Sequence, residues 1–188
     1  MDKVTYQGLT FEPYITYEQI QERIAQIGAE INKEYAGKRP LFLCVLNGAF
    51  PFAADLFRAV DTDAEITFIR LKSYEGTSTT GSVKQILGLG ANEIEGRHVI
   101  VVEDIVDTGV TISHLLADLR RQNPASLRVA TLLFKPESER CGVKPDYVGF
   151  SIPGKFIIGF GLDLDGLARN LRDIHVLSSE HEDMEQKA

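Results

Sequence analysis

The strongest structural signal in this chain is the segment His98-Val99-Ile100-Val101-Val102-Glu103-Asp104-Ile105-Val106-Asp107-Thr108-Gly109-Val110-Thr111. Its continuous β-branched run, residues 99–102, is typical of a strand buried on both faces of a parallel sheet. Apolar residues at the i, i+3, i+4 and i+7 spacing of an amphipathic helix follow at Ile112, Leu115, Leu116 and Leu119. The segment therefore predicts a strand, a short turn and a helix, the repeating unit of an α/β fold.

The turn between that strand and helix is suited to binding a phosphate. A helix start offers unpaired backbone N–H groups and the positive end of the helix dipole. Gly109 lets a ligand approach the backbone closely, and the hydroxyls of Thr108 and Thr111 add hydrogen-bond donors. We therefore expect residues 108–111 to hold a phosphate group.

Three carboxylates, those of Glu103, Asp104 and Asp107, lie just before this turn. Ligands of open α/β sheets bind at the carboxyl ends of strands, so these side chains fall where chemistry is expected. They are suited to accepting hydrogen bonds from a sugar diol, holding Mg²⁺ through water or moving a proton. The plainer interpretation is a solvated acidic loop in which Asp107 or Thr111 caps the helix, but it explains one residue and not three carboxylates. The combination predicts a sugar phosphate as ligand.

Composition and charge narrow the class of protein. A chain of 188 residues with 44% hydrophobic and 25% charged residues fits one soluble globular domain over residues 1–188, with a frayed tail over 179–188. The apolar runs fall far short of the ~20 residues of a transmembrane helix, and the N-terminus lacks an apolar signal-peptide core. We therefore predict a cytoplasmic protein with no membrane partner. The net charge of −7 argues against a nucleic-acid partner.

Helix and strand patterns alternate along the rest of the chain. Thr16 is placed to cap a helix over Tyr17–Tyr35, and a second helix is expected over Ala49–Val60, with Pro51 in its first turn. Strands are predicted over residues 41–46, 65–71, 99–102, 127–134, 147–150 and 156–161. This alternation predicts a mostly parallel central sheet flanked by helices. Residues 72–82 are small and polar, and we interpret them as a lid over the site.

A second set of candidate site residues follows two later strands. Lys135 stands at the end of one strand, where its ammonium is a donor for a carbonyl group. Phe156 offers an aromatic face, and Ile157 brings backbone groups close to it. Together with the phosphate turn, these residues are what a flat heterocycle needs: a stacking surface, a cationic donor and nearby backbone groups.

Val101 to Gly109 resembles the phosphoribosyl pyrophosphate (PRPP) signature of the type I phosphoribosyltransferases. The likeness is to the hypoxanthine (guanine) phosphoribosyltransferases in particular, and it continues through nearly the whole chain. Residues 41–49 are similar to the family's pyrophosphate-contacting loop, residues 70–74 to the start of its catalytic loop, and residues 144–160 to its purine-binding end. The resemblance implies the type I phosphoribosyltransferase fold, in which a mostly parallel sheet carries a small hood built from the terminal segments and a mobile loop.

The resemblance also implies roles for the residues around the phosphate turn. Glu103 and Asp104 would hold the ribose hydroxyls, directly or through Mg²⁺, and Asp107 would act as general base and acid at N7 of the purine. The backbone and hydroxyls of residues 107–111 would cradle the 5′-phosphate. Val110 stands within this cradle where some relatives carry lysine, which removes one charge but keeps the backbone donor.

For the purine, the resemblance implies contacts with four residues besides Asp107. Lys135 would donate to O6, Phe156 would stack on the ring and Ile157 would contact it through backbone groups. Asp163 would lie at the purine and hold a second Mg²⁺ on the pyrophosphate.

For the pyrophosphate, Arg169 would neutralise the leaving group, and Asn47 and Gly48 would contact it. Asn47 occupies a position that is often basic in relatives, and a strained or cis peptide before Gly48 would let it present a backbone N–H instead. Ser73 and Tyr74 would close over the reaction centre.

The implied activity belongs to purine salvage: transfer of the 5-phosphoribosyl group from PRPP to N9 of hypoxanthine or guanine, giving IMP or GMP and pyrophosphate. Mg²⁺ is the implied cofactor, and a homodimer or homotetramer is the implied assembly. Lys135 favours a 6-oxopurine over adenine because an ammonium donates to a carbonyl and repels an amino group. Two alternatives stay open here, a xanthine-preferring phosphoribosyltransferase and a nucleotide-sensing regulator that binds RNA or DNA on the same fold.

Overall fold

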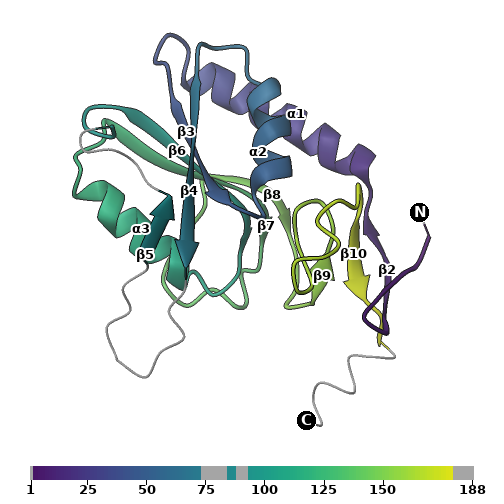
Figure 1. Ribbon diagram of the computed structural model, residues 1–188. Coiled ribbons are helices and arrows are strands. Elements are labelled where there is room, and N and C mark those ends of the chain that lie inside the picture. The colour runs from purple at the N-terminus through teal and green to yellow at the C-terminus, as the bar shows by residue number, and fades with distance from the viewer. Residues whose placement is uncertain (1, 73–83, 88–92, 180–188) are drawn as a thin grey trace.

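The fold is built around a six-stranded sheet (Figure 1). In spatial order its strands are β5 (Lys84–Leu87), β4 (Glu65–Lys72), β3 (Leu41–Leu46), β6 (His98–Val106), β7 (Ser126–Phe134) and β8 (Tyr147–Ser151). β5 pairs antiparallel with β4, and the other neighbours are parallel. The computed structural model describes residues 2–72, 84–87 and 93–179. The predicted α/β fold with a mostly parallel sheet is confirmed.

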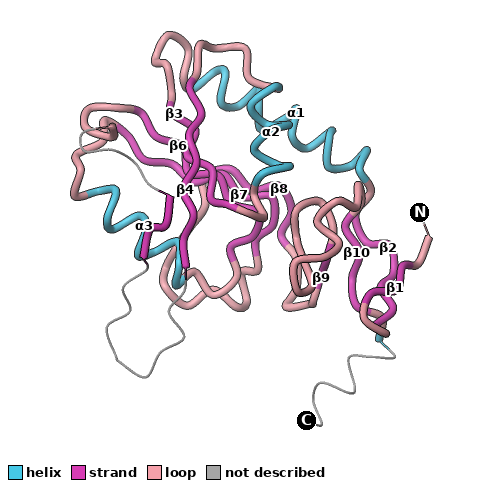
Figure 2. The backbone as a smooth tube through the Cα atoms, in the orientation of Figure 1, coloured by secondary structure: helices cyan, strands magenta, loops and turns pink. Residues whose placement is uncertain are grey.

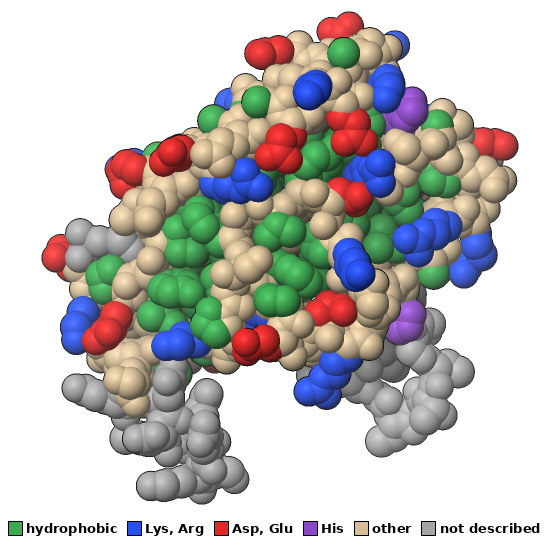
Figure 3. All heavy atoms as spheres, turned by 180° about the vertical axis from the view of Figure 1, so that it is seen from behind, with side chains coloured by type: hydrophobic (Ala, Val, Ile, Leu, Met, Phe, Trp, Pro, Cys, Tyr) green, Lys and Arg blue, Asp and Glu red, His purple; other side chains and the backbone are tan. Residues whose placement is uncertain are grey.

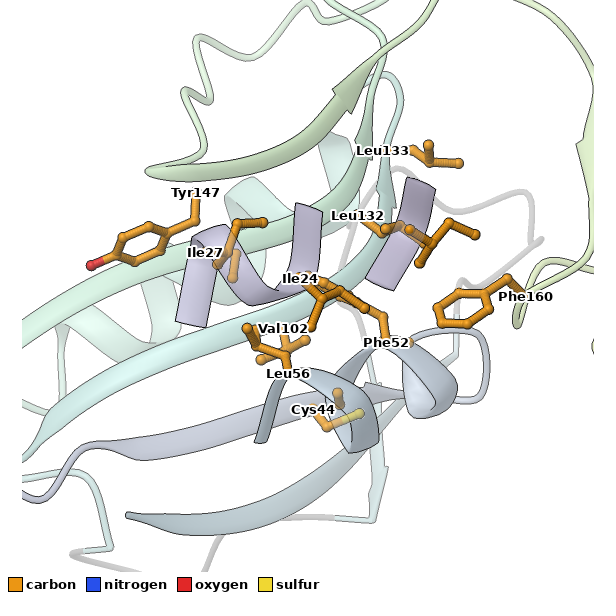
Figure 4. Close-up of a cluster of buried hydrophobic side chains, with 14 of the residues drawn as sticks. Ile24, Ile27, Cys44, Phe52, Leu56, Val102, Leu132, Leu133, Tyr147 and Phe160 are labelled. Carbon is orange, nitrogen blue, oxygen red and sulfur yellow. The ribbon is translucent and has the colours of Figure 1, made fainter. Parts of the chain in front are cut away.

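Helices cover both faces of this sheet. α1 (Tyr17–Glu34) and α2 (Phe50–Arg58) lie on one face, and α3 (Val110–Arg120) lies on the other (Figure 1). Side chains of a strand alternate between its faces, so the apolar run of β6 fills both cores. Ile100 and Val102 pack with α1 and α2, whereas Val99 and Val101 pack with α3. Figure 4 shows Val102 among the side chains of the first cluster. Burial on both faces explains why this strand is apolar without alternation.

The helix α1 follows directly from its sequence. The hydroxyl of Thr16 accepts the backbone N–H of Gln19 (3.2 Å), and the side-chain oxygen of Gln19 accepts the N–H of Thr16 (2.9 Å), which together form a capping box. The apolar stripe of the helix is fully or almost fully buried: Ile20, Ile24, Ile27 and Ile31. Burial of each such side chain stabilises the fold by about 1.5–3 kcal/mol. The predicted helix and its cap are confirmed.

A second, smaller sheet is built from both ends of the described chain. It has four antiparallel strands in the order β1 (Val4–Tyr6), β2 (Leu9–Ile15), β10 (Ile174–Leu177) and β9 (Ile157–Ile158). Figure 2 shows this sheet beside the larger one. It corresponds to the predicted hood, and we use that name for it below.

Two predicted strands differ from the observed ones by more than a single end residue. β6 does not end at Val102, because its ladder with β7 continues through Glu103–Thr131 to Val106–Phe134. The two carboxylates that were expected beyond the strand therefore lie within it. The strand predicted over 156–161 is reduced to β9, because Gly159, Phe160 and Gly161 all have positive φ angles, which turn the chain out of the sheet.

Charge and hydropathy of the described part of the chain add two further findings. None of its helices combines the length and the apolar character needed to cross a bilayer. On the face shown in Figure 3, Lys and Arg side chains are interspersed with Asp and Glu, and no extended basic stripe runs across the described residues seen there. A generic nucleic-acid surface needs such a stripe, so this face gives no support for the nucleic-acid-binding alternative.

Candidate active site

The turn between β6 and α3 borders a hollow of about 320 Å³, which residues 105–112 line together with Glu103 and apolar side chains from the ends of β3 and β4. α3 begins at Gly109, which has a φ of +81°, and no side chain caps this helix. The alternative of a cap by Asp107 or Thr111 is therefore wrong. Neither Lys nor Arg occurs among the described residues that line the hollow. The turn can bind an anion through the backbone N–H groups at the uncapped start of α3 and through the hydroxyls of the exposed residues Thr108 and Thr111.

Glu103 and Asp104 are neighbours on β6, so their side chains leave opposite faces of the strand. Glu103 is 7% exposed and lines the hollow, where burial, with a smaller effect of Asp104, raises the pKa of its carboxyl well above the usual range. Asp104 lies against Gly48 on the other side: a Cβ built on Gly48 would come within 1.6 Å of its Oδ2. Burial raises the pKa of Asp104 to about 6, although its Oδ1 accepts the N–H of Ile105 at 2.8 Å.

Asp107 and Lys135, predicted to contact N7 and O6 of one purine, are in contact with each other. The Nζ atom of Lys135 lies 2.8 Å from Oδ2 of Asp107, and the Lys135 side chain is only 11% exposed, against 45% for Asp107. The backbone holds the pair in place, because the N–H of Lys135, just after β7, donates to the carbonyl of Val106 at the end of β6 (3.0 Å). A donor and an acceptor therefore stand side by side at the carboxyl ends of two adjacent strands.

Asn47 and Gly48 form the turn between β3 and α2. Asn47 is exposed, Gly48 is buried, and the cis peptide bond is the one between Leu46 and Asn47, one residue earlier than the position considered from the sequence. The loop that joins β9 to β10 approaches this turn closely, since a Cβ built on Gly161 would come within 2.0 Å of the Gly48 carbonyl oxygen. The lack of a side chain at both glycines lets the loops meet, because any larger residue would collide with the opposing backbone or with Asp104.

Arg169 and Asp163 lie in the loop that joins β9 to β10 and form an ion pair. The Nη2 atom of Arg169 lies 2.6 Å from Oδ1 of Asp163, and its Nη1 donates to the carbonyl of Gly161 (2.6 Å). Oδ2 of Asp163 accepts the N–H of Gly166 (2.7 Å). The positive charge of Arg169 lowers the pKa of Asp104, but this effect is smaller than the increase caused by burial. The structure thus brings one cation and two carboxylates together beside Gly48.

The predicted stacking residue Phe156 is 40% exposed, and its ring lies 6.1 Å from that of Phe11 at an interplanar angle of 45°. The next residue, Ile157, is buried in β9. The hood therefore presents an aromatic side chain with an open face next to a fixed backbone segment. Ser73 and Tyr74 lie outside the described residues, as does nearly all of the predicted lid; β4 and β5, which flank residues 73–83, pair with each other.

The donor set is consistent with a divalent cation that is held only in part by the protein. The described residues contain no cluster of three His, Cys, Asp or Glu side chains around one point. Mg²⁺ usually keeps several waters and binds through one or two carboxylates plus substrate phosphates, so a full protein cage is not required. The buried carboxyls of Glu103 and Asp104 have raised pKa values that a nearby cation would offset. The residues present thus fit a hard cation that arrives with a phosphorylated ligand.

One contact near the site was missed by the sequence analysis. Glu139, in the loop after β7, lies against Gly109 of the phosphate turn. No motif or periodicity marks this residue, because the contact joins two loops that only the parallel pairing of β6 and β7 brings together.

Comparison with known proteins identifies relatives that match most of the chain. Residues 16–165 match the model of the phosphoribosyl transferase domain. The hypoxanthine-guanine phosphoribosyltransferase of Streptococcus thermophilus is 43% identical over 87% of this chain and 91% of its own length, and that of Bacillus subtilis is 41% identical over the same shares.

A solved structure of a relative supports the same grouping. The hypoxanthine phosphoribosyltransferase of Trypanosoma cruzi in complex with the product IMP matches with a TM-score of 0.85 and 38% identity, over 94% of this chain and 98% of that one. Identity of this level over nearly the full length, combined with the same fold, shows the family. The chain belongs to the type I phosphoribosyltransferase family, among the hypoxanthine-guanine phosphoribosyltransferases.

Proposed function

We infer that this protein is a purine salvage enzyme that transfers the 5-phosphoribosyl group from PRPP to N9 of hypoxanthine or guanine, releasing pyrophosphate and giving IMP or GMP. The observation that carries this inference is the contact between Asp107 and Lys135 at the carboxyl edge of the sheet, directly before the uncapped start of α3. The Asp107 carboxylate is a proton acceptor for N7 of a 6-oxopurine, and the neighbouring Lys135 ammonium is a hydrogen-bond donor for its O6 carbonyl. The relatives named above support the same activity.

The phosphoribosyl group would lie along the end of β6. The backbone and hydroxyls of residues 107–111 hold the 5′-phosphate at the positive end of the α3 dipole. Glu103 and Asp104 orient the ribose hydroxyls. Fixing the sugar at both ends places its C1 atom where the purine arrives, which lowers the entropic cost of the reaction.

The purine would lie between the hood and the end of β7. Phe156 stacks on the ring, and the backbone of Ile157 and the Asp163 segment meet its edge. Lys135 donates to O6, and Asp107 accepts the N7 proton as N9 attacks C1. Without a purine, the Lys135 ammonium donates to the Asp107 carboxylate. When the purine binds, Lys135 donates to O6 and Asp107 accepts from N7, so both groups keep a hydrogen-bond partner.

The pyrophosphate would leave toward the turn of Asn47 and Gly48, with Arg169 and Asp163 beside it. Departure leaves positive charge on the ribose and negative charge on the leaving group, which Arg169 stabilises. Members of this family generally need a divalent metal, and bound Mg²⁺ would supply neutralisation of negative charge. Glu103 or Asp104 would hold one ion at the ribose, and Asp163 would hold a second at the pyrophosphate. Ser73 and Tyr74 stay predictions for the closing segment, as do a cytoplasmic location and an assembly of two or four copies.

A pyrophosphate-release assay tests this function. The protein is incubated with PRPP and Mg²⁺ together with hypoxanthine, guanine, xanthine or adenine in separate reactions. We expect release that depends on hypoxanthine or guanine and is absent with adenine. Faster release with xanthine would show a xanthine-preferring phosphoribosyltransferase instead. Binding of RNA without any base-dependent release of pyrophosphate would contradict the enzymatic function.

A further inference from the structure

The loop after β7 supports the phosphate turn from outside the hollow, and the proposed function gives it no role beyond Lys135. Within this loop the carboxylate of Glu139 accepts three successive backbone N–H groups. Its Oε1 accepts from Cys141 (2.7 Å) and Val143 (3.0 Å), and its Oε2 accepts from Gly142 (3.1 Å). A carboxylate with three backbone donors is held in one place. These bonds also lower the pKa of Glu139, so the side chain is ionised at neutral pH.

Two contacts connect this anchored carboxylate to the phosphate turn. A Cβ built on Gly109 would come within 2.5 Å of Oε1 of Glu139, so the Cα of Gly109 rests against the carboxylate. The N–H of the next residue, Arg140, donates to the carbonyl of Thr108 (3.1 Å). Both residues at the centre of the turn are therefore touched by the same short segment. Gly109 has a φ of +81°, a conformation the turn must keep for α3 to start there.

We propose that Glu139 is a positioning residue for the 5′-phosphate: its carboxylate folds residues 139–143 into a support that fixes the backbone of Thr108 and Gly109. The proposal rests on the proposed function, because it assumes that this turn binds the 5′-phosphate. Glu139 is not a ligand of the phosphate, since two anions repel each other, and its effect is transmitted through the turn. The lack of Lys and Arg among the described residues that line the hollow makes this support important, because no cation there compensates for a misplaced N–H group.

The support is specific for one part of the nucleotide. Lys135, at the start of the same loop, is held independently by its N–H bond to Val106 and its ion pair with Asp107. Loss of the Glu139 carboxylate should therefore disturb the phosphate turn and leave the purine contacts in place. Comparison of IMP with inosine, which has the same base and ribose but no phosphate, isolates this difference.

The test is calorimetric binding of IMP and of inosine to the full chain and to three variants. In Glu139→Ala, we expect IMP to bind about 10-fold more weakly, the effect of one lost charge-assisted hydrogen bond, with inosine unchanged. Glu139→Gln keeps Oε1 as acceptor for Cys141 and Val143 and should recover most of the IMP affinity. Glu137→Ala removes an exposed carboxylate from the same loop and serves as matched control, with no change for either ligand.

The outcomes separate the two levels of inference. Unchanged IMP affinity in Glu139→Ala, or an equal loss for IMP and inosine, would overturn the positioning role. Failure of the wild-type chain to bind IMP would contradict the proposed function instead. Should Glu139→Ala not fold, Glu139→Asp makes the same test, because its shorter side chain withdraws the carboxylate from Gly109 and from the three N–H groups.

Discussion

Replacing Asp107 with asparagine removes the proposed proton acceptor and preserves the size of the side chain. The structure allows the effect on catalysis to be separated from the effect on folding. The substituted amide would keep a carbonyl oxygen for the Lys135 ammonium, which now lies 2.8 Å from Oδ2 of Asp107. The Asp107 side chain is 45% exposed, so solvent screens the ion pair. Its loss should cost about 0–1 kcal/mol of unfolding free energy, which lowers the melting temperature by at most about 2–4 °C.

The catalytic effect should be far larger. A general base contributes about 10²–10⁴-fold to the rate, which corresponds to roughly 3–5 kcal/mol of activation free energy. We expect kcat to fall within that range while the KM for PRPP stays near its wild-type value, because Asp107 accepts a proton from the purine and not from the sugar.

Steady-state kinetics with PRPP and hypoxanthine varied in turn, together with thermal unfolding, measure both quantities. Asp118→Asn is the matched control, since Asp118 is an exposed carboxylate of α3 that pairs with Arg121, remote from the purine contacts. Unchanged turnover in Asp107→Asn would refute the general-base role, and a rise in the KM for hypoxanthine at constant kcat would reduce Asp107 to a binding residue.

Three further substitutions test other parts of the site. Val110 is 48% exposed beside a hollow without described cations, so Val110→Lys should lower the KM for PRPP about two- to fivefold, an advantage that kinetics in rising salt should remove. Gly48→Ala would bring a Cβ within 1.6 Å of Oδ2 of Asp104, whereas one on Gly154 meets only Ser138 Oγ at 3.5 Å. We expect kcat/KM for PRPP to fall about 10-fold or more in Gly48→Ala and to stay unchanged in Gly154→Ala. Burial raises the pKa of Asp104 from 3.8 to about 6, so between about pH 4 and 6 the folded protein binds more protons than the unfolded chain, and its unfolding free energy falls as pH rises. Asp104→Asn should make this fall shallower in a thermal-unfolding series without added metal, and the contribution of Glu103, whose pKa is also raised, should persist.

The predictable parts of the fold are those with a local signal. The bounds of β3 match the predicted strand, because a run buried on both faces is apolar at every position. The cap and stripe of α1 are similarly local. The strands β1, β2, β5 and β10 were not predicted. For β2 and β10 the reason is that they pair over more than 150 residues of sequence, and the sequence pattern carries no information about that partner.

The site was predictable where a motif is continuous in sequence. The segment from Glu103 to Thr111 correctly predicts a turn before a helix, but two of its acidic residues, Glu103 and Asp104, were placed after the end of the strand and lie within β6. Because Glu103 and Asp104 are neighbours within a strand, their side chains lie on opposite faces of it. The sequence alone described them as a pair beside the ribose and did not show this separation. The contacts of Gly48 with Asp104 and of Glu139 with Gly109 depend on how separate loops meet, and no sequence pattern encodes that.

The central claim is that the Asp107 and Lys135 pair selects a 6-oxopurine for transfer at this site. It is tested most directly by competition, with equal concentrations of hypoxanthine and adenine, limiting PRPP and separation of the nucleotides formed. We predict that the protein makes IMP and no detectable AMP. Formation of AMP at a comparable rate, or consumption of PRPP without either nucleotide, would contradict the account.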